Sequence, residues 1–285
     1  MSEMTNLTAS LAASVAMATF IAGPALSADF SERFEGGKPA VSGLNGKVDF
    51  GYMYLDFDGL PEHVNGAYGI GTITAPVGER FGLQIDAGLI GLYPTAAGTV
   101  DADGGGVGGH FFWRDPDQGL VGAYAHYVAL GSSFADVDLV RYGVEGEFYI
   151  DRVTLEGFAG ADTVDGGGAS ETYANLDFGA SYYVTDNVKL SAGVRRAFDQ
   201  TSGIVGAEAM LPFASNNVSL YANAQFSDET TSVRAGLRVY FGQPDKSLIA
   251  RHREDDPESM LFDFADTAFA ADDTGSTPPP PGPID

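Results

Sequence analysis

Apolar residues alternate with polar or small residues from Gly46 to Gly242, and no helical period stands out in this region. In the run from Phe81 to Leu89, every second residue is apolar and the residues between them are Gly, Gln or Asp. A period of two is typical of β-strands with one apolar face. The pattern predicts twelve strands, over residues 47–58, 64–75, 80–92, 105–114, 119–130, 137–150, 153–162, 171–184, 188–197, 203–213, 217–227 and 231–242.

Soluble β-sandwiches also alternate in this way, so three further features decide the fold class. The connections alternate between tight turns, such as Asp151-Arg152, and longer or Gly-rich stretches, such as 94–104 and 163–170. Aromatic residues gather near the ends of the segments, as in Phe111–Trp113, where a membrane interface would hold them. The number of segments is even, as in single-chain barrels of bacteria. Together they predict an all-β, antiparallel, up-and-down transmembrane β-barrel over residues 46–242, of about 12 strands within a range of about 10–14.

The N-terminus has the features of an export signal. The stretch from Leu11 to Gly23 is apolar, and small residues follow as far as Ala28. This arrangement predicts a secretory signal peptide over residues 1–28, followed by a periplasmic segment over residues 29–45. The first ten residues contain Glu3 and no Lys or Arg, which is unusual for a signal peptide, and an uncleaved membrane anchor is the alternative.

Several short stretches resemble those of Gram-negative outer-membrane β-barrels. Residues Tyr182–Leu190 resemble a periplasmic hairpin of such barrels, and Val233–Phe241, with its terminal Phe, resembles the closing strand that the barrel-assembly machinery recognises. Residues Val41–Lys47 and Phe112–Pro116 are similar to uncharacterised porin-like proteins of this class. The resemblance covers about residues 41–242 and implies insertion into outer-membrane lipid by that machinery. In such barrels the closing strand normally ends the chain, whereas 43 residues follow it here.

Composition narrows the classes of function. The 285 residues carry a formal net charge of −24, which disfavours a nucleic-acid partner because phosphates would be repelled. The chain has no Cys, which excludes disulfides, thiol catalysis and Cys-based zinc sites. The excess of acidic over basic residues predicts that any conductance would favour cations.

If the apolar face meets lipid, the opposite face lines the lumen. A two-residue turn at Asp151-Arg152 places Glu147 opposite Glu156. A three-residue turn over residues 185–187 pairs Val184 with Val188 and places Asp177 opposite Arg195. Arg141, Arg234 and Arg238 are predicted to bridge across the lumen. The candidate lumen or constriction residues are Arg141, Glu145, Glu147, Glu156, Asp177, Arg195, Glu208, Arg234 and Arg238.

These features predict an exported outer-membrane protein with passive, porin-like passage of small solutes or ions through a narrow charged lumen. Two alternatives stay open. One is a barrel with a closed lumen, filled by structural ion pairs, that acts as a structural or surface-interaction protein. The other is a secreted soluble β-protein.

No enzyme, cofactor or metal site is predicted. Carboxylates such as Glu145 and Glu147 share a face in any strand, so their pairing does not indicate general acid–base catalysis. His110 and His126 have no Ser companion at strand spacing, and the four His residues match no metal-binding motif.

The C-terminal tail, residues 243–285, is acidic and ends in a Pro-rich stretch. Its composition predicts a disordered periplasmic tail. The spacing of Leu261, Phe264 and Phe269 also allows a short amphipathic helix, which leaves two further hypotheses. The tail could dock to a periplasmic partner, or it could fold into the lumen as a plug.

Overall fold

The computed structural model describes residues 37–58, 63–95, 101–132, 136–214, 217–243 and 245–266. The chain divides into two units, residues 1–37 and residues 38–285, and the description below concerns the second unit. The predicted signal peptide and residues 29–36 lie outside the described residues. Within the described ranges, no helix is long and apolar enough to cross a membrane.

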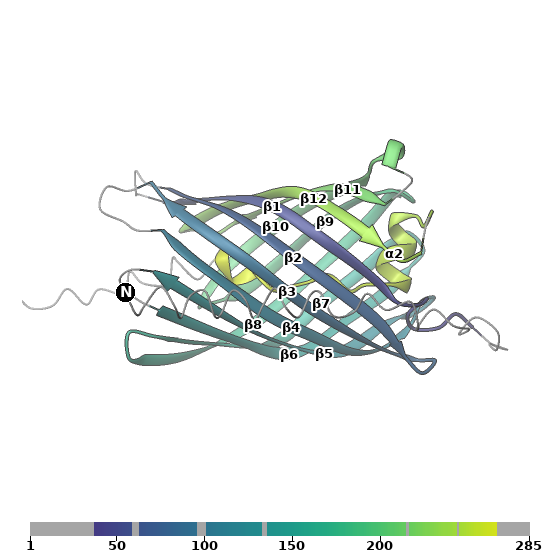
Figure 1. Cartoon of the computed structure of the whole chain (residues 1–285), viewed down its shortest axis with the longest axis horizontal. Coiled ribbons are helices and arrows are strands. Elements are labelled where there is room, and N and C mark those ends of the chain that lie inside the picture. The colour runs from purple at the N-terminus through teal and green to yellow at the C-terminus, as the bar shows by residue number, and fades with distance from the viewer. Residues whose placement is uncertain are drawn as a thin grey trace, which may run out of the picture. The chain divides into compact units, whose positions relative to one another are not determined.

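Twelve antiparallel strands form one closed barrel, in which each strand pairs with its neighbours in the chain and β1 pairs with β12 (Figure 1). Closure leaves no strand edge unpaired, as a β-structure in lipid requires. The strands are β1 (Asn45–Phe57), β2 (His63–Val77), β3 (Phe81–Pro94), β4 (Ala102–Asp115), β5 (Gly119–Ser132), β6 (Asp136–Ile150), β7 (Val153–Gly166), β8 (Ala169–Thr185), β9 (Val188–Ala197), β10 (Gln200–Met210), β11 (Val218–Phe226) and β12 (Thr230–Phe241).

The predicted fold class is confirmed, and so is each of the twelve predicted strands. The prediction of a longer connection over residues 163–170 is wrong. β7 continues to Gly166 and β8 begins at Ala169, so that only Gly167 and Gly168 join them. Both glycines have positive φ, 59° and 86°, which suits a two-residue hairpin turn. Strand pairing therefore extends into residues whose Gly content had indicated a loop.

The predicted registers hold at the charged positions. Glu147 lies opposite Glu156, and Asp177 lies opposite Arg195. The pairing of Val184 with Val188 is wrong, because Thr185 pairs with Val188 and the β8–β9 ladder is irregular between Tyr183 and Thr185. A bulge of this kind absorbs one extra residue without changing the register farther along the strands.

The outer surface of the barrel is apolar. Side chains such as Phe50, Val121 and Phe178 are 59%, 58% and 63% exposed, and they alternate along their strands with buried or half-buried residues. Soluble proteins rarely expose so many large apolar side chains around one sheet, whereas lipid favours them. The exterior therefore fits a bilayer.

We call the barrel opening at which β1 begins and β12 ends the turn mouth, and the opposite opening the loop mouth. The described part of the tail, residues 245–266, folds back into the barrel: the helix α2 (Leu248–Glu254) lies at the turn mouth, and the chain continues inside to the 3₁₀ helix η2 (Asp263–Asp266) (Figure 1). The prediction of a disordered tail is wrong for these residues, and the plug hypothesis holds for them. Residues 267–285 lie outside the described residues.

Local interactions explain why the tail forms a helix at the turn mouth. The Ser247 hydroxyl accepts a hydrogen bond from the Ala250 backbone N–H at 3.4 Å, as an N-cap does. Leu248 is fully buried in an apolar cluster with Tyr183, Met210 and Tyr240. Burying a Leu side chain contributes about 1.5–3 kcal/mol, so this one contact is a substantial anchor for α2.

Candidate functional site in the barrel lumen

The pleat of the strands places the predicted lumen residues on the inner face of the barrel. All nine are buried or half-buried, and the alternate positions of their strands carry the exposed apolar side chains. The structure brings four of them, Arg195, Arg234, Arg238 and Glu208, into contact with the tail. The other five are Arg141, Glu145, Glu147, Glu156 and Asp177.

Asp263 of the tail lies between two arginines from different strands. Arg195 of β9 approaches Oδ2 at 3.0 Å, and Arg234 of β12 approaches Oδ1 at 3.3 Å. Arg234 also pairs with Asp266 and donates to the carbonyl oxygen of Phe262 at 2.9 Å. Arg195 keeps a second partner in the wall, since its Nε donates to Asp177 at 2.7 Å.

Glu258 of the tail is held in the same way, closer to the turn mouth. Lys189 of β9 lies 3.0 Å from its Oε2, and Arg238 of β12 lies 3.3 Å from its Oε1. Arg238 also pairs with Asp49 at 2.7 Å and with Glu208 at 3.0 Å, both on the barrel wall. We call Lys189, Arg195, Arg234 and Arg238 the charged wall.

The expected role of Arg141 as a bridge across the lumen is wrong. Arg141 donates to Asp162 at 2.6 Å, and these two residues are direct cross-strand partners on β6 and β7. Asn175 of β8 donates to the same carboxylate at 2.7 Å. Arg141 is therefore neutralised within the wall, whereas Arg234 bridges to the tail.

The carboxylates on the acidic side of the lumen accept hydrogen bonds from neutral side chains or lie next to a histidine. Tyr149 donates to Glu147 at 2.6 Å, and Ser181 donates to Glu156 at 2.6 Å. Farther round the wall, His110 lies between Glu145 at 2.9 Å and Asp86 at 3.2 Å. The described residues contain no group of three His, Cys, Asp or Glu side chains placed to hold a metal ion.

A cavity of about 210 Å³ remains between the acidic side and the charged wall. Its lining includes Glu147, Glu156, Lys189, Arg195 and the tail residue Asp263. It is large enough for several water molecules, each of which takes about 30 Å³ in the liquid. The tail thus narrows the lumen, but it leaves this space open next to the charged side chains.

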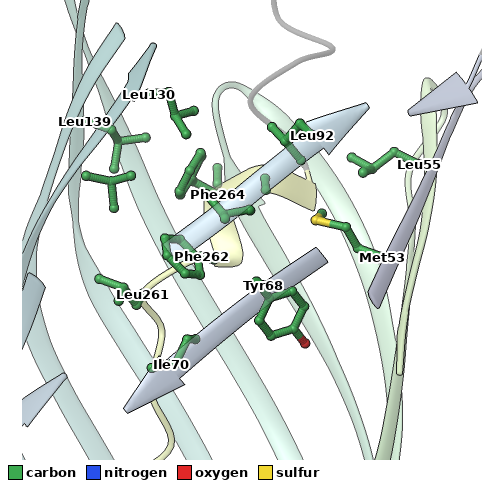
Figure 2. Close-up of a cluster of buried hydrophobic side chains, with 14 of the residues drawn as sticks. Met53, Leu55, Tyr68, Ile70, Leu92, Leu130, Leu139, Leu261, Phe262 and Phe264 are labelled. Atoms are coloured by element: carbon green, nitrogen blue, oxygen red, sulfur yellow. The ribbon is translucent and has the colours of Figure 1, made fainter. Parts of the chain in front are cut away.

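Toward the loop mouth, the inner faces of β1, β2, β3, β5 and β6 carry apolar side chains. Leu261, Phe262, Phe264 and Ala265 of the tail are at most 1% exposed, and they pack against inward-facing side chains of the barrel (Figure 2). Figure 2 shows Phe262 and Phe264 surrounded by strand residues from several sides. We call these strand residues the apolar wall: Met53, Leu55, Tyr68, Ile70, Ile90, Leu92, Val128, Leu130 and Leu139.

At the turn mouth, α2 is held by the residues just before β1 and by the β6–β7 turn. Lys38 donates to Glu254 at 2.6 Å, and Lys246 lies 3.1 Å from the same carboxylate. Burial alone raises the pKa of Glu254, but the two lysines outweigh it and hold that pKa below its ordinary value. Arg253 donates to the carbonyl oxygen of Val153 at 2.9 Å, which ties α2 to the β6–β7 turn.

Sequence reasoning missed the tail residues of the site. Glu258, Asp263 and Asp266 were counted only as part of an acidic tail, although the spacing of Leu261 and Phe264 around Asp263 already suggested an amphipathic segment. Lys189 was missed too, although its alternation with Val188 and Leu190 indicates the inner face. No local signal indicated which wall residue each carboxylate would meet.

Comparison with known proteins places the fold. No protein-family model and no curated protein matches the chain. Among solved structures, it is similar to the translocator domain of the autotransporter NalP from Neisseria meningitidis, with 17% identity over 70% of this chain and 88% of that one, and a TM-score of 0.52. An outer-membrane channel from Pseudomonas putida F1 gives 11% identity over 74% of this chain and all of that one, with a TM-score of 0.55. The chain therefore has the fold of Gram-negative outer-membrane β-barrels, as its sequence indicated.

Proposed function

We propose that this protein resides in the outer membrane and passes small polar solutes or ions through a lumen that its own C-terminal tail opens and closes. The observation that carries the proposal is how residues 258–266 are held. Their carboxylates pair with cations of the charged wall beside a cavity large enough for several water molecules, which lets the contacts exchange with water or solute. A porin-like path then needs a displaced tail, because residues 258–266 lie inside the barrel and narrow its lumen.

The outside of the barrel supports the location. Its apolar exterior fits outer-membrane lipid, and the barrel-assembly machinery would insert it, with residues 1–28 as the export signal. A periplasmic partner that draws α2 away from the turn mouth would release the tail. The hydrogen bonds and ion pairs of Lys38, Lys246 and Arg253 are among the contacts that such a partner would replace.

One observation favours a second function, a barrel that stays closed and serves a structural or surface role. The apolar wall buries two Phe side chains of the tail almost completely. Burial of this kind contributes about 1.5–3 kcal/mol for each side chain, and a tail held this firmly would open rarely.

Planar-bilayer recordings of the full chain separate the two functions. The test variant is Glu258→Gln with Asp263→Asn and Asp266→Asn, which removes the tail's charges on the charged wall. The control, Asp101→Asn with Asp199→Asn and Glu229→Gln, changes the net charge equally at exposed positions. Both must show the heat-dependent gel shift of a folded barrel.

We expect discrete conductance steps whose open fraction rises at least about tenfold in the test variant, which corresponds to a loss of about 1.4 kcal/mol of tail docking. The control should match the unmodified chain. If the test variant is folded and trypsin cleaves its tail after Arg251 or Arg253, yet no steps occur, the channel proposal is wrong and the closed-lumen function stands.

A further inference from the structure

We infer that the lumen contains a binding site for an extended molecule with at least two carboxylates, and that the tail occupies this site as an intramolecular stand-in. The inference rests on the proposed function, since a ligand reaches the site only when the tail is displaced. It adds the chemical class of what the lumen binds.

The site has two levels, and the same two strands build both. At the level nearer the turn mouth, Lys189 of β9 and Arg238 of β12 hold Glu258. At the level nearer the loop mouth, Arg195 of β9 and Arg234 of β12 hold Asp263. β9 runs from the turn mouth toward the loop mouth, and β12 runs the opposite way, so Lys189 shares a level with Arg238 and Arg195 shares a level with Arg234. The tail, which runs from the turn mouth into the barrel, meets these two levels in the same order. Each level presents two cations to one carboxylate, a geometry that suits carboxylate recognition.

Two of the four cations of the charged wall depend on an acidic occupant. Within the described residues, the ion pairs of Arg234 are all with the tail, to Asp263 and Asp266. Lys189 has one wall carboxylate near it, Glu208 at 3.9 Å, and a closer partner in Glu258 at 3.0 Å. A buried cation that loses its partner is costly, so departure of the tail leaves a site that favours another anion.

The spacing of the levels limits the ligand. Four residues lie between Glu258 and Asp263, so the Cα atoms of the two acids are at most about 18 Å apart along an extended chain. The cavity beside both levels, lined by Lys189, Arg195 and Arg234, gives a second molecule room to approach. An extended acid with repeating carboxylates fits this arrangement, although the protein carries a net charge of −24. The expected cation preference, which rested on overall composition, does not describe this local site.

The experiment uses the full chain with Glu258→Gln, Asp263→Asn and Asp266→Asn, so that the tail is present but no longer competes by charge. The probe is a hexaglutamate peptide, and hexaglutamine is its uncharged control. Fluorescence anisotropy of the labelled peptides on the folded barrel in detergent measures binding without any need for conductance. Block of single-channel current by the same peptides measures binding in the lumen.

The matched variants are Arg195→Gln and Arg196→Gln, added separately to that background. Arg195 lies in the lumen, whereas its neighbour Arg196 points outward, is 55% exposed and pairs with the exposed Asp199. We expect hexaglutamate to bind at least about tenfold more tightly than hexaglutamine, Arg195→Gln to remove most of this difference, and Arg196→Gln to leave it unchanged.

The outcomes keep the inference and the proposed function apart. Equal binding of both peptides, or equal effects of the two arginine variants, would overturn the carboxylate site even if the channel conducts. Tight, Arg195-dependent binding of hexaglutamate in a barrel that never conducts would support the site and overturn the channel. Current block by hexaglutamate that Arg195→Gln relieves would support both.

Discussion

The tail meets two contrasting surfaces inside one barrel. The apolar wall contacts Leu261, Phe262 and Phe264 through side chains that are almost fully buried, and the charged wall contacts Glu258 and Asp263 through ion pairs beside a cavity. Apolar burial is non-directional and nearly independent of salt, whereas exchangeable ion pairs respond to salt, pH and competing ions. The apolar wall therefore supplies most of the free energy that holds the tail, and the charged wall makes tail docking sensitive to salt, pH and competing ions.

The same strand can contribute to both kinds of surface. The inner face of β1 carries Lys47 and Asp49 near the turn mouth and Met53 and Leu55 near the loop mouth. A lumen that is polar throughout would fill with water, and one that is apolar throughout would hold the tail permanently. The change along β1 shows how one barrel combines a firm anchor with a site that a ligand can compete for.

Removing the anchor should have the largest effect. Phe262→Ala with Phe264→Ala deletes two side chains that are each 1% exposed, and buried Phe→Ala changes cost about 3–5 kcal/mol each. The tail should then leave the lumen, and trypsin should cut after Arg251 or Arg253 in the folded barrel. Phe178→Ala is the control, because Phe178 is 63% exposed on the outer surface. A double variant whose tail stays as protected as in the unmodified chain would show that the apolar wall is not the anchor.

Breaking the charged wall should have a smaller effect on docking. Arg234→Gln leaves Asp266 without its arginine, while Asp263 keeps Arg195. Loss of one partner of a buried pair costs about 3–5 kcal/mol, and the adjacent cavity, which admits water, should reduce this to about 2–3 kcal/mol. Trypsin cleavage of the tail should increase in proportion, and adding Asp266→Asn should recover part of the loss. If Arg196→Gln, which alters an exposed pair, has the same effect, the charged wall has no special role.

The strands and their registers could be predicted because one strong physical constraint governs them. Every strand has one face toward lipid, so its period of two is visible in the sequence, and tight turns such as Asp151-Arg152 fix the pairing of Glu147 with Glu156. The polarity of the inner face has no such rule. Its apolar part was missed, although Tyr52–Leu55 carries four consecutive large apolar residues, a sign that both faces are apolar there.

The tail could not be placed from the sequence because its contacts are distant and its composition is ambiguous. Glu258 and Lys189 are 69 residues apart, and pairs at such separations leave no local pattern. An acidic, Pro-rich segment is typical of disorder when it has no partner. Here the partner is the barrel itself, so the apolar residues between the acids carry the information.

Salt should affect the contacts of the tail with the two walls differently, and its effect on tail docking should be smaller still. Raising the ionic strength to 1 M shortens the screening length to about 3 Å, which weakens ion pairs beside the water-accessible cavity and leaves apolar burial unaffected or stronger. We expect tail docking to weaken by about 1 kcal/mol in the unmodified chain, measured by trypsin cleavage or by the open fraction. The variant with Glu258→Gln, Asp263→Asn and Asp266→Asn should respond much less. An equal salt response in both would assign the effect to other charges.

The smallest expected effect is that of pH on the docking of α2 at the turn mouth, where the tail contacts neither the apolar wall nor the charged wall. Lys38 and Lys246 lower the pKa of Glu254 below 4.5 in the folded protein, so their contribution is fully present above pH 4.5 and is lost as the pH falls through the lowered value. Lys38 is 56% exposed and its ion pair is screened, so we expect a loss of only about 0.5 kcal/mol.

A spin label on Ala250→Cys, in a chain without native Cys, reports the mobility of α2. Its mobile fraction should grow as the pH falls below 4.5, and Glu254→Gln should show part of that mobility already at pH 7. A label whose pH response is the same with and without Glu254→Gln would assign the change to carboxylates deeper in the lumen, and thus to the charged wall.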